Sequence, residues 1–160
     1  EVHKLLNSIG IKSWCKTSGA TGLHICVPTG AAYDYDTVRE FAEAVCNVIH
    51  QRLPSITSVE RMPVRRRGKI YLDFLQNRRG QTLAAPYCVR PHPGATVSTP
   101  LKWSEVKPGL RPTQFTMLNV KKRIQRVGDL WPRPHASHAN LKTAMKKLSK
   151  ILQHSKNRSI

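Results

Sequence analysis

Acidic residues are scarce in this chain. Its 160 residues include 9 Asp and Glu against 27 Lys and Arg, which gives a formal net charge of +18 at pH 7. This imbalance excludes an acidic mimic of nucleic acid. It favours a polyanionic partner, which could be nucleic acid, a nucleotide or an anionic membrane surface. A chain of this length can form one domain with one core, with or without a tail.

Long apolar runs and paired cysteines are also missing. No apolar stretch reaches the roughly 18–20 residues that cross a membrane, and the chain does not open with the basic-then-apolar pattern of a signal peptide. The four cysteines form no Cys-x-x-Cys pair, and three of them lie among apolar residues. They are therefore predicted to be reduced, buried cytosolic thiols rather than a zinc site or a disulfide framework.

Hydrophobic periodicity predicts an α+β fold. Apolar residues three or four apart predict helices at 1–9, 36–53, 116–127 and 140–152. Runs of β-forming residues predict strands at 11–16, 23–27, 69–75 and 82–90, the first two joined as a hairpin by a loop of small residues. Strands interleaved with helices and a hairpin are typical of α+β proteins.

Few carboxylates are candidates for chemistry. Asp34 and Asp36 have the Asp-x-Asp spacing of a metal site, but they stand at a predicted helix start, where Asp caps free N–H groups. We interpret them as caps. Asp73 lies within the predicted strand 69–75, where an unpaired carboxylate is costly unless it faces a site, a metal or an arginine. Asp73 is therefore the candidate functional carboxylate.

The loop of residues 16–24 has the composition of an anion-binding loop. Its glycines allow backbone N–H groups to approach a phosphate, and Lys16, Ser18 and Thr21 add donors. The alternative interpretation of this segment is a plain hairpin turn of small residues without a binding role, with His24 as a core histidine. The loop lacks the Gly-Lys-Ser/Thr ending of a Walker A motif.

Positive charge is concentrated in two regions. Residues 61–80 hold seven Lys or Arg and one acid, and residues 121–160 hold eleven and one. In the second region four lysines lie on the polar side of the predicted helix 140–152: Lys142, Lys146, Lys147 and Lys150. They form either a solvated helix face or a surface that contacts the DNA backbone.

Four segments together resemble one known family. They are KTSGATGLHICVP (16–28), GKIYLDFLQNRRGQT (68–82), APYCVR (85–90) and PGATVSTPLKW (93–103). In this order they resemble the second motif, the third motif and the following segment of the polymerase/primase domain of bacterial DNA ligase D, in the archaeo-eukaryotic primase superfamily. The resemblance runs from about Leu5 to Trp131.

The resemblance implies a primase-like mixed sheet flanked by helices, incomplete at its N-terminal end. It covers residues 1–134, with a basic helical tail at 135–160. It implies a DNA repair polymerase that transfers nucleotides at DNA ends or gaps in non-homologous end joining. Members use Mn or Mg and an NTP or dNTP. The implied partners are DNA ends or gapped DNA, a nucleoside triphosphate, Ku and a ligase domain, in the bacterial cytoplasm at the nucleoid and without a membrane.

The resemblance also assigns roles to residues. Asp73 would be the third metal carboxylate and hence catalytic, while Ser18 and His24 would hold the triphosphate of the incoming nucleotide. Arg90 would reach the same triphosphate, and Arg66 would lie near it. The nucleotide-binding set is therefore Lys16, Ser18, His24, Arg66 and Arg90.

Departures from the family pattern limit the expected activity. In the family a metal-binding Asp-x-Asp precedes the helix before the second motif. Here that helix is residues 1–9, and Asp34 and Asp36 come too late. We therefore expect a nucleotide-binding half-site that is inactive alone, with the divalent metal bound only when upstream carboxylates are present. Two alternatives stay open: a catalytically inactive basic DNA-binding accessory protein, and a protein that docks on a ligase.

Overall fold

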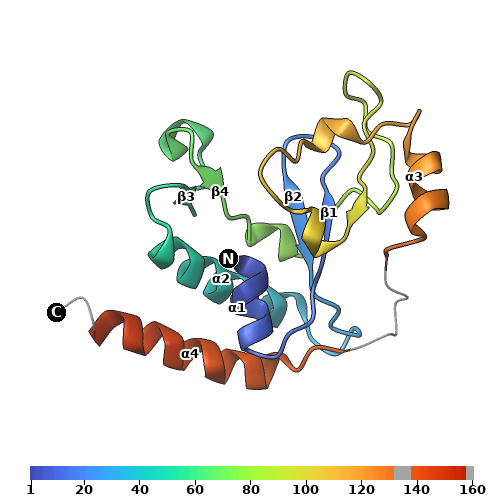
Figure 1. Ribbon diagram of the computed structural model, residues 1–160. Coiled ribbons are helices and arrows are strands. Elements are labelled where there is room, and N and C mark those ends of the chain that lie inside the picture. The colour runs from blue at the N-terminus through green and yellow to red at the C-terminus, as the bar shows by residue number, and fades with distance from the viewer. Residues whose placement is uncertain (132–137, 158–160) are drawn as a thin grey trace. The chain divides into compact units, whose positions relative to one another are not determined.

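The computed structural model describes residues 1–131 and 138–157, and it confirms an α+β fold. Within these residues the chain forms two units (Figure 1). The first unit comprises residues 1–12, 29–82 and 138–157, and the second comprises residues 13–28 and 83–131. The boundary predicted between a domain and a basic tail, near residue 134, lies outside the described residues.

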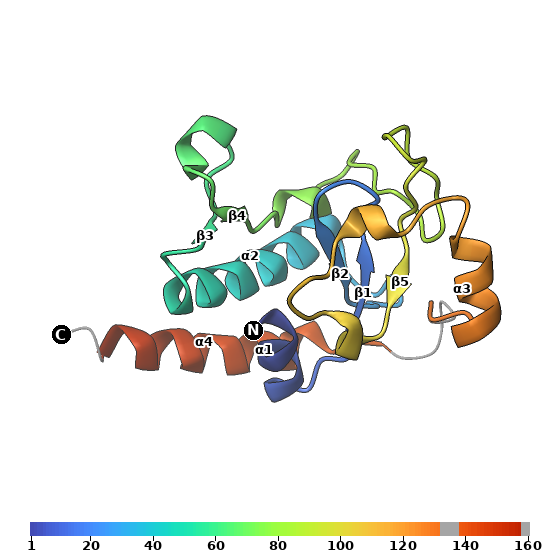
Figure 2. The ribbon, with the colours of Figure 1, turned by 45° about the horizontal axis from the view of Figure 1, so that its top comes forward.

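The first unit is built on three helices: α1 (Val2–Ser8), α2 (Tyr35–Arg52) and α4 (Leu141–Asn157). Helix α2 packs against α1 and α4, and α4 runs alongside α2 in both views (Figures 1 and 2). Leu5 of α1 and Leu141 and Leu148 of α4 are fully buried. The apolar stripe of the basic C-terminal helix therefore belongs to the core of this unit.

Helix α2 begins at a carboxylate cap. The Asp34 Oδ1 atom accepts a hydrogen bond of 2.7 Å from the backbone N–H of Thr37, and hydrogen bonding to the side chain and then the backbone of Thr37 holds the pKa of the Asp34 carboxyl below its ordinary value. Asp36 lies in the first turn and pairs with Arg39 at 3.4 Å. The interpretation as a cap is confirmed for Asp34, whereas Asp36 lies inside the first turn and is not the cap.

The strand predicted at 69–75 is shorter than expected. Only Ile70–Tyr71 is extended (β4), paired in parallel with Thr57–Ser58 (β3). The 3₁₀ turns η1 (Pro63–Arg66) and η2 (Leu75–Asn77) flank it, and Asp73 lies after the strand with its side chain exposed. The prediction that Asp73 sits inside an apolar strand is therefore wrong, because the two-residue partner β3 can support no longer pairing.

The second unit contains the predicted hairpin. Strands β1 (Trp14–Thr17) and β2 (Leu23–Cys26) pair antiparallel, with Lys16 opposite His24. On its other side β1 pairs antiparallel with β5 (Pro100–Leu101), so the sheet order is β2-β1-β5. This pairing brings residues 96–101 against the hairpin, although more than 80 residues separate Thr17 from Ser98.

The strand predicted at 82–90 does not form. Pro86 and Tyr87 interrupt it, and Tyr87 has a left-handed φ of 64° that extended backbone does not allow. The segment is held instead by single bonds: Tyr87 N–H donates to the Ser98 carbonyl at 2.7 Å, and Val89 forms an isolated bridge with Val97.

The remaining elements of the second unit are short helices. They are η3 (Trp103–Glu105), η4 (Pro112–Gln114) and α3 (Val120–Val127). No helix among the described residues is long and apolar enough to cross a membrane. Of the cysteines, Cys15 is buried, Cys26 and Cys46 are half-buried and Cys88 is exposed. Burial raises the pKa of the Cys15 thiol to about 11 and that of Cys46 to about 12.

A bidentate ion pair links η3 to α3. The two terminal nitrogens of Arg123 donate to the two carboxylate oxygens of Glu105, each at 2.7 Å, and the Arg123 side chain is only 9% exposed. These hydrogen bonds, more than any other contact, lower the pKa of Glu105 below its ordinary 4.5. Charge-assisted pairs with this geometry are the stronger kind.

We predict that Glu105→Gln lowers the free energy of unfolding at pH 7 by about 1–3 kcal/mol. Because folding depresses the Glu105 pKa, its contribution is complete above pH 4.5 and is lost as the pH falls through the folded value. Urea titrations from pH 7 to pH 3 should therefore show a shallower loss of stability in the variant. Glu40→Gln, on an exposed part of α2, should leave both quantities unchanged.

Candidate functional site

The hairpin turn is closed by the Ser18 side chain. Its Oγ accepts hydrogen bonds from the backbone N–H groups of Ala20 (3.0 Å) and Gly22 (3.1 Å), and the Ser18 N–H donates to the Gly22 carbonyl at 2.9 Å. Two acceptor positions of the hydroxyl are thus used inside the loop, while its O–H remains a donor. The loop is preformed around Ser18.

Gly19 lets Arg90 approach this loop closely. The Gly19 backbone has a φ of +70°, and a Cβ there would lie 2.5 Å from Arg90 Cγ and 3.0 Å from the Ser98 backbone nitrogen. The Arg90 backbone is fixed by its N–H, which donates to the Thr96 carbonyl at 2.7 Å. A glycine in the turn therefore seats the arginine against the same loop that Ser18 closes.

Lys16 is buried beneath the loop and faces His24. Its side chain is 1% exposed, and its Nζ lies 2.9 Å from His24 Nδ1, 2.7 Å from the Ala84 carbonyl and 2.7 Å from Ser98 Oγ. Burial lowers the pKa of the Lys16 ammonium, and the positive charge of Arg90 lowers it further, while Cys26 opposes both. Lys16, Ser18, His24 and Arg90 together are called the hairpin site below.

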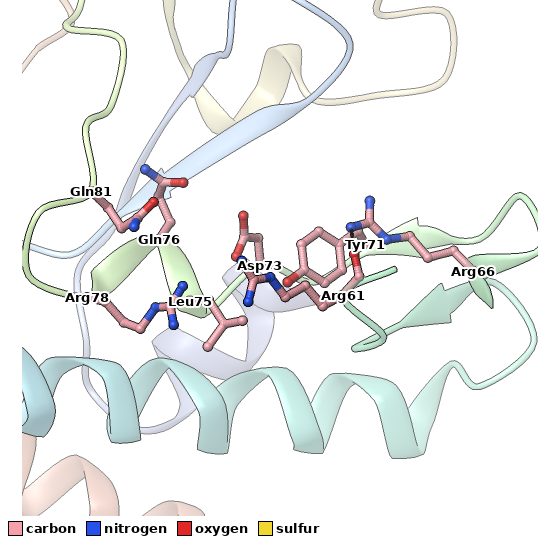
Figure 3. A pocket seen from close by; sticks show the side chains of 8 residues that line it. All are labelled: Arg61, Arg66, Tyr71, Asp73, Leu75, Gln76, Arg78 and Gln81. Carbon is pink, nitrogen blue, oxygen red and sulfur yellow. Dashed lines mark hydrogen bonds between the residues drawn. The ribbon is translucent and has the colours of Figure 1, made fainter. Parts of the chain in front are cut away.

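A second polar hollow lies in the first unit, with a volume of about 230 Å³. Figure 3 shows its lining side chains, which come from η1 and the segment before it, from β4 and the residues after it, and from η2 and the residues after it. This hollow, called the arginine pocket below, is lined by Arg61, Arg66, Tyr71, Asp73, Leu75, Gln76, Arg78 and Gln81. Three arginines and one carboxylate make it positively charged.

Arg66 is held at the edge of the arginine pocket. Its guanidinium lies over the Tyr71 ring, 3.7 Å from the ring centre, and its Nε donates to the Glu60 carbonyl at 2.9 Å. Burial raises the pKa of the Tyr71 hydroxyl, the nearby Asp73 carboxylate adds to the rise, and Arg66 opposes it. Stacking on an aromatic ring fixes the plane of a guanidinium without using all of its donors.

The arginine pocket also contains a polar atom of Arg78 without a partner among the described residues. This atom is Nε, and it is buried. A buried N–H without an acceptor is costly in a native protein and calls for an explanation. An anion in the arginine pocket would supply that acceptor.

The described residues do not fit a metal centre. A two-metal site needs several carboxylate or other oxygen ligands. Asp73 is the one carboxylate that lines the arginine pocket, and within residues 1–131 and 138–157 no three His, Cys, Asp or Glu side chains gather closely enough to hold an ion. The chain by itself therefore offers one metal ligand at most in this pocket.

The four lysines of α4 are all exposed, and Lys142, Lys146 and Lys150 are four residues apart. Lys147 donates from Nζ to the Ile9 carbonyl at 3.1 Å, at the C-terminal end of α1, where a cation is favourable. Whether any of the four contacts DNA stays a prediction, but Lys147 has a structural partner within its own unit.

The six predicted site residues thus fall into two groups. Lys16, Ser18, His24 and Arg90 come together in the second unit, whereas Arg66 and Asp73 line the arginine pocket of the first unit. Sequence reasoning missed Ser98, which enters the hairpin site only through sheet pairing. It also missed the buried Nε atom of Arg78, since nothing in the local sequence indicates burial.

Serine, histidine and arginine side chains supply the kinds of donors that phosphate oxygens accept from, and the chain presents them in two separate regions of an α+β fold. Residues 1–131 match the LigD primase-polymerase domain, and the chain belongs to this family.

Several bacterial proteins are similar to the chain. A bifunctional non-homologous end joining protein LigD of Bacillus subtilis is 36% identical over 129 residues, which are 80% of this chain and 21% of that protein. A multifunctional LigD of Pseudomonas aeruginosa is 30% identical over 145 residues, 89% of this chain and 17% of that protein. The chain thus spans about a fifth of these relatives.

A solved structure shares the fold. The polymerase domain of Mycobacterium tuberculosis ligase D, in complex with DNA, matches with a TM-score of 0.77 and 32% identity. The match covers 86% of this chain and 48% of that domain.

We predict that Gly19→Ala destabilises the second unit by at least about 1–2 kcal/mol, because alanine is strained at positive φ and its Cβ would collide with Arg90. Gly22→Ala is the matched control, since a Cβ there meets only Ser18 Oγ at 4.0 Å. Thermal unfolding followed by circular dichroism measures both. Equal melting temperatures for the two variants would contradict the close packing of Arg90 on the loop.

Proposed function

We propose that this chain is the nucleotide- and DNA-binding part of a DNA repair polymerase that acts at DNA ends or gaps in non-homologous end joining. The observation that carries the proposal is the hairpin site, in which Ser18, His24 and Arg90 come from two separate segments of the residues that match the family model. The end-joining names of the relatives and the DNA complex of the similar domain support it.

In this proposal the hairpin site holds the triphosphate of the incoming nucleotide. Ser18 O–H is a neutral donor, His24 is a second donor and Arg90 is a charged one, so together they can bind phosphate oxygens that carry charge during transfer. Arg66 adds a second positive group, held in place by Tyr71. The relatives are named as bifunctional and multifunctional end-joining proteins. Following the family resemblance, we propose a ligase domain and Ku as partners of the whole protein, in the bacterial cytoplasm.

We further propose that the chain alone does not catalyse transfer. The family role of Asp73 is to hold a divalent metal with two other carboxylates, and the arginine pocket contains no second carboxylate. A primer-extension assay of this chain with manganese and ribonucleotides should therefore give no product. Robust extension would overturn this part of the proposal while leaving nucleotide binding to be measured separately.

We predict that Arg90→Gln and Ser18→Ala each weaken nucleotide binding by roughly tenfold, because each removes a hydrogen bond to a charged phosphate. Calorimetric titration of the chain with ATP and manganese measures the affinity. Arg126→Gln removes the same charge from an exposed position on α3 and should have no effect. Unchanged affinity in both site variants would argue against the hairpin site as the nucleotide site.

We predict that replacing Lys142, Lys146 and Lys150 together by Gln weakens duplex DNA binding and lowers the slope of log K against log salt by about 2–3, since each phosphate contact contributes about 0.9. The matched control replaces three other exposed lysines, Lys12, Lys102 and Lys107. Equal slopes in the two triple variants would show that α4 does not bind DNA. If DNA binding needs α4 and nucleotide binding is absent, a basic accessory protein is the better description.

A further inference from the structure

The three N–H groups of the Lys16 ammonium each have an acceptor within the second unit. Nζ lies 2.7 Å from the Ala84 carbonyl, 2.7 Å from Ser98 Oγ and 2.9 Å from His24 Nδ1. Ser98 Oγ donates its own hydrogen to the Thr17 carbonyl at 2.8 Å, so it must accept from Lys16. An ammonium with three N–H groups and three acceptors at 1% exposure has no donor left for a ligand.

This arrangement determines the state of the histidine ring. An ammonium can only donate, so His24 Nδ1 must accept and carries no hydrogen. The neutral ring then bears its hydrogen on Nε2, because in imidazole the bond made by one nitrogen sets the tautomer of the other. Direct pairing of Lys16 with His24 across β1 and β2 keeps the two side chains in contact.

We propose that Lys16 is a positioning residue for His24: it holds the ring neutral, with the hydrogen on Nε2, so that His24 and not Lys16 donates to a phosphate oxygen of the nucleotide. The inference rests on the proposed function, which gives His24 its ligand. It departs from the sequence-based expectation that Lys16 itself contacts phosphate.

Groups near the pair act on the ammonium in both directions. The Lys16 ammonium is in hydrogen-bond contact with the ring, and Arg90 lies close enough to Lys16 to act on its ionisation. Cys26 and Cys88 act on Lys16 in the opposite direction to Arg90, and burial raises the pKa of the Cys26 thiol. Burial works against the ammonium, but its three hydrogen bonds satisfy the charged form.

The first experiment reads the tautomer directly. Long-range ¹H–¹⁵N correlation spectra of the chain distinguish a hydrogen on Nε2 from one on Nδ1, and loss of one ring in His24→Gln assigns the signals among the seven histidines. We expect the hydrogen on Nε2 in the wild-type chain. In Lys16→Met we expect a mixture of the two tautomers, while Lys12→Met leaves the signals unchanged.

The second experiment measures coupling in ATP binding with manganese. Lys16→Met should weaken binding about tenfold when His24 is present and should have no further effect in a His24→Gln background. Equal losses in the two backgrounds would mean that Lys16 contacts phosphate independently and would overturn the proposal. So would a wild-type ring with its hydrogen on Nδ1, which signifies a neutral lysine that accepts from histidine.

The two readouts separate the inference from the function on which it rests. If the wild-type chain binds no ATP, the proposed function fails, and the spectra still decide the state of the Lys16–His24 pair. If Lys16→Met does not fold, the wild-type tautomer alone decides, because only an Nε2–H ring agrees with a donating ammonium.

Discussion

The second unit depends on one constraint, the need of a buried ammonium for three acceptors. Lys16 finds them on three separate segments: the facing strand, the turn before Pro86 and the segment that leads into β5. The neighbouring Thr17 adds to the same junction, because its Oγ donates to the Val97 carbonyl at 3.0 Å and accepts from the Thr99 N–H at 2.9 Å. An unsatisfied polar group there would be costly, so the segments must meet in this register.

This junction also builds the hairpin site. The register that satisfies Lys16 places residues 96–98 beneath the turn. At Gly19 the Arg90 side chain occupies the space that a Cβ atom would need. Ser18 then closes the loop from within. The parts of the chain that hold the site together are thus buried polar side chains, and the groups left to meet a ligand are the ones that this network orients.

The arginine pocket follows a different principle. The Arg66 guanidinium is held by stacking on Tyr71, the Nε atom of Arg78 is buried, and Asp73 is the one carboxylate that lines the pocket beside them. A pocket with this excess of charge is suited to anions rather than to a cation alone. Metal chemistry in this family therefore needs carboxylates that the arginine pocket of this chain does not itself supply.

Sequence patterns predicted the regular elements well. Helices α2 and α4 and the β1–β2 hairpin lie close to the predicted ranges, because amphipathic periodicity and a glycine-rich turn are local signals. The prediction failed at 69–75 and 82–90. The residues of both segments have strand propensity. The partner of the first segment is only two residues long, and in the second segment Tyr87 adopts a positive φ. Strand formation depends on a partner elsewhere in the chain, and a local pattern does not contain it.

The residue types of the candidate site were visible in the sequence, since the motifs that contain Ser18, His24, Asp73 and Arg90 resemble one family. The sequence also determined the positive charge and the shortage of carboxylates. Only the tertiary structure decided that Lys16 is buried, that Ser98 receives one of its hydrogen bonds, and that Asp73 is exposed beyond its strand. Burial and hydrogen-bond partners depend on segments about 80 residues apart, which only the packed chain brings together.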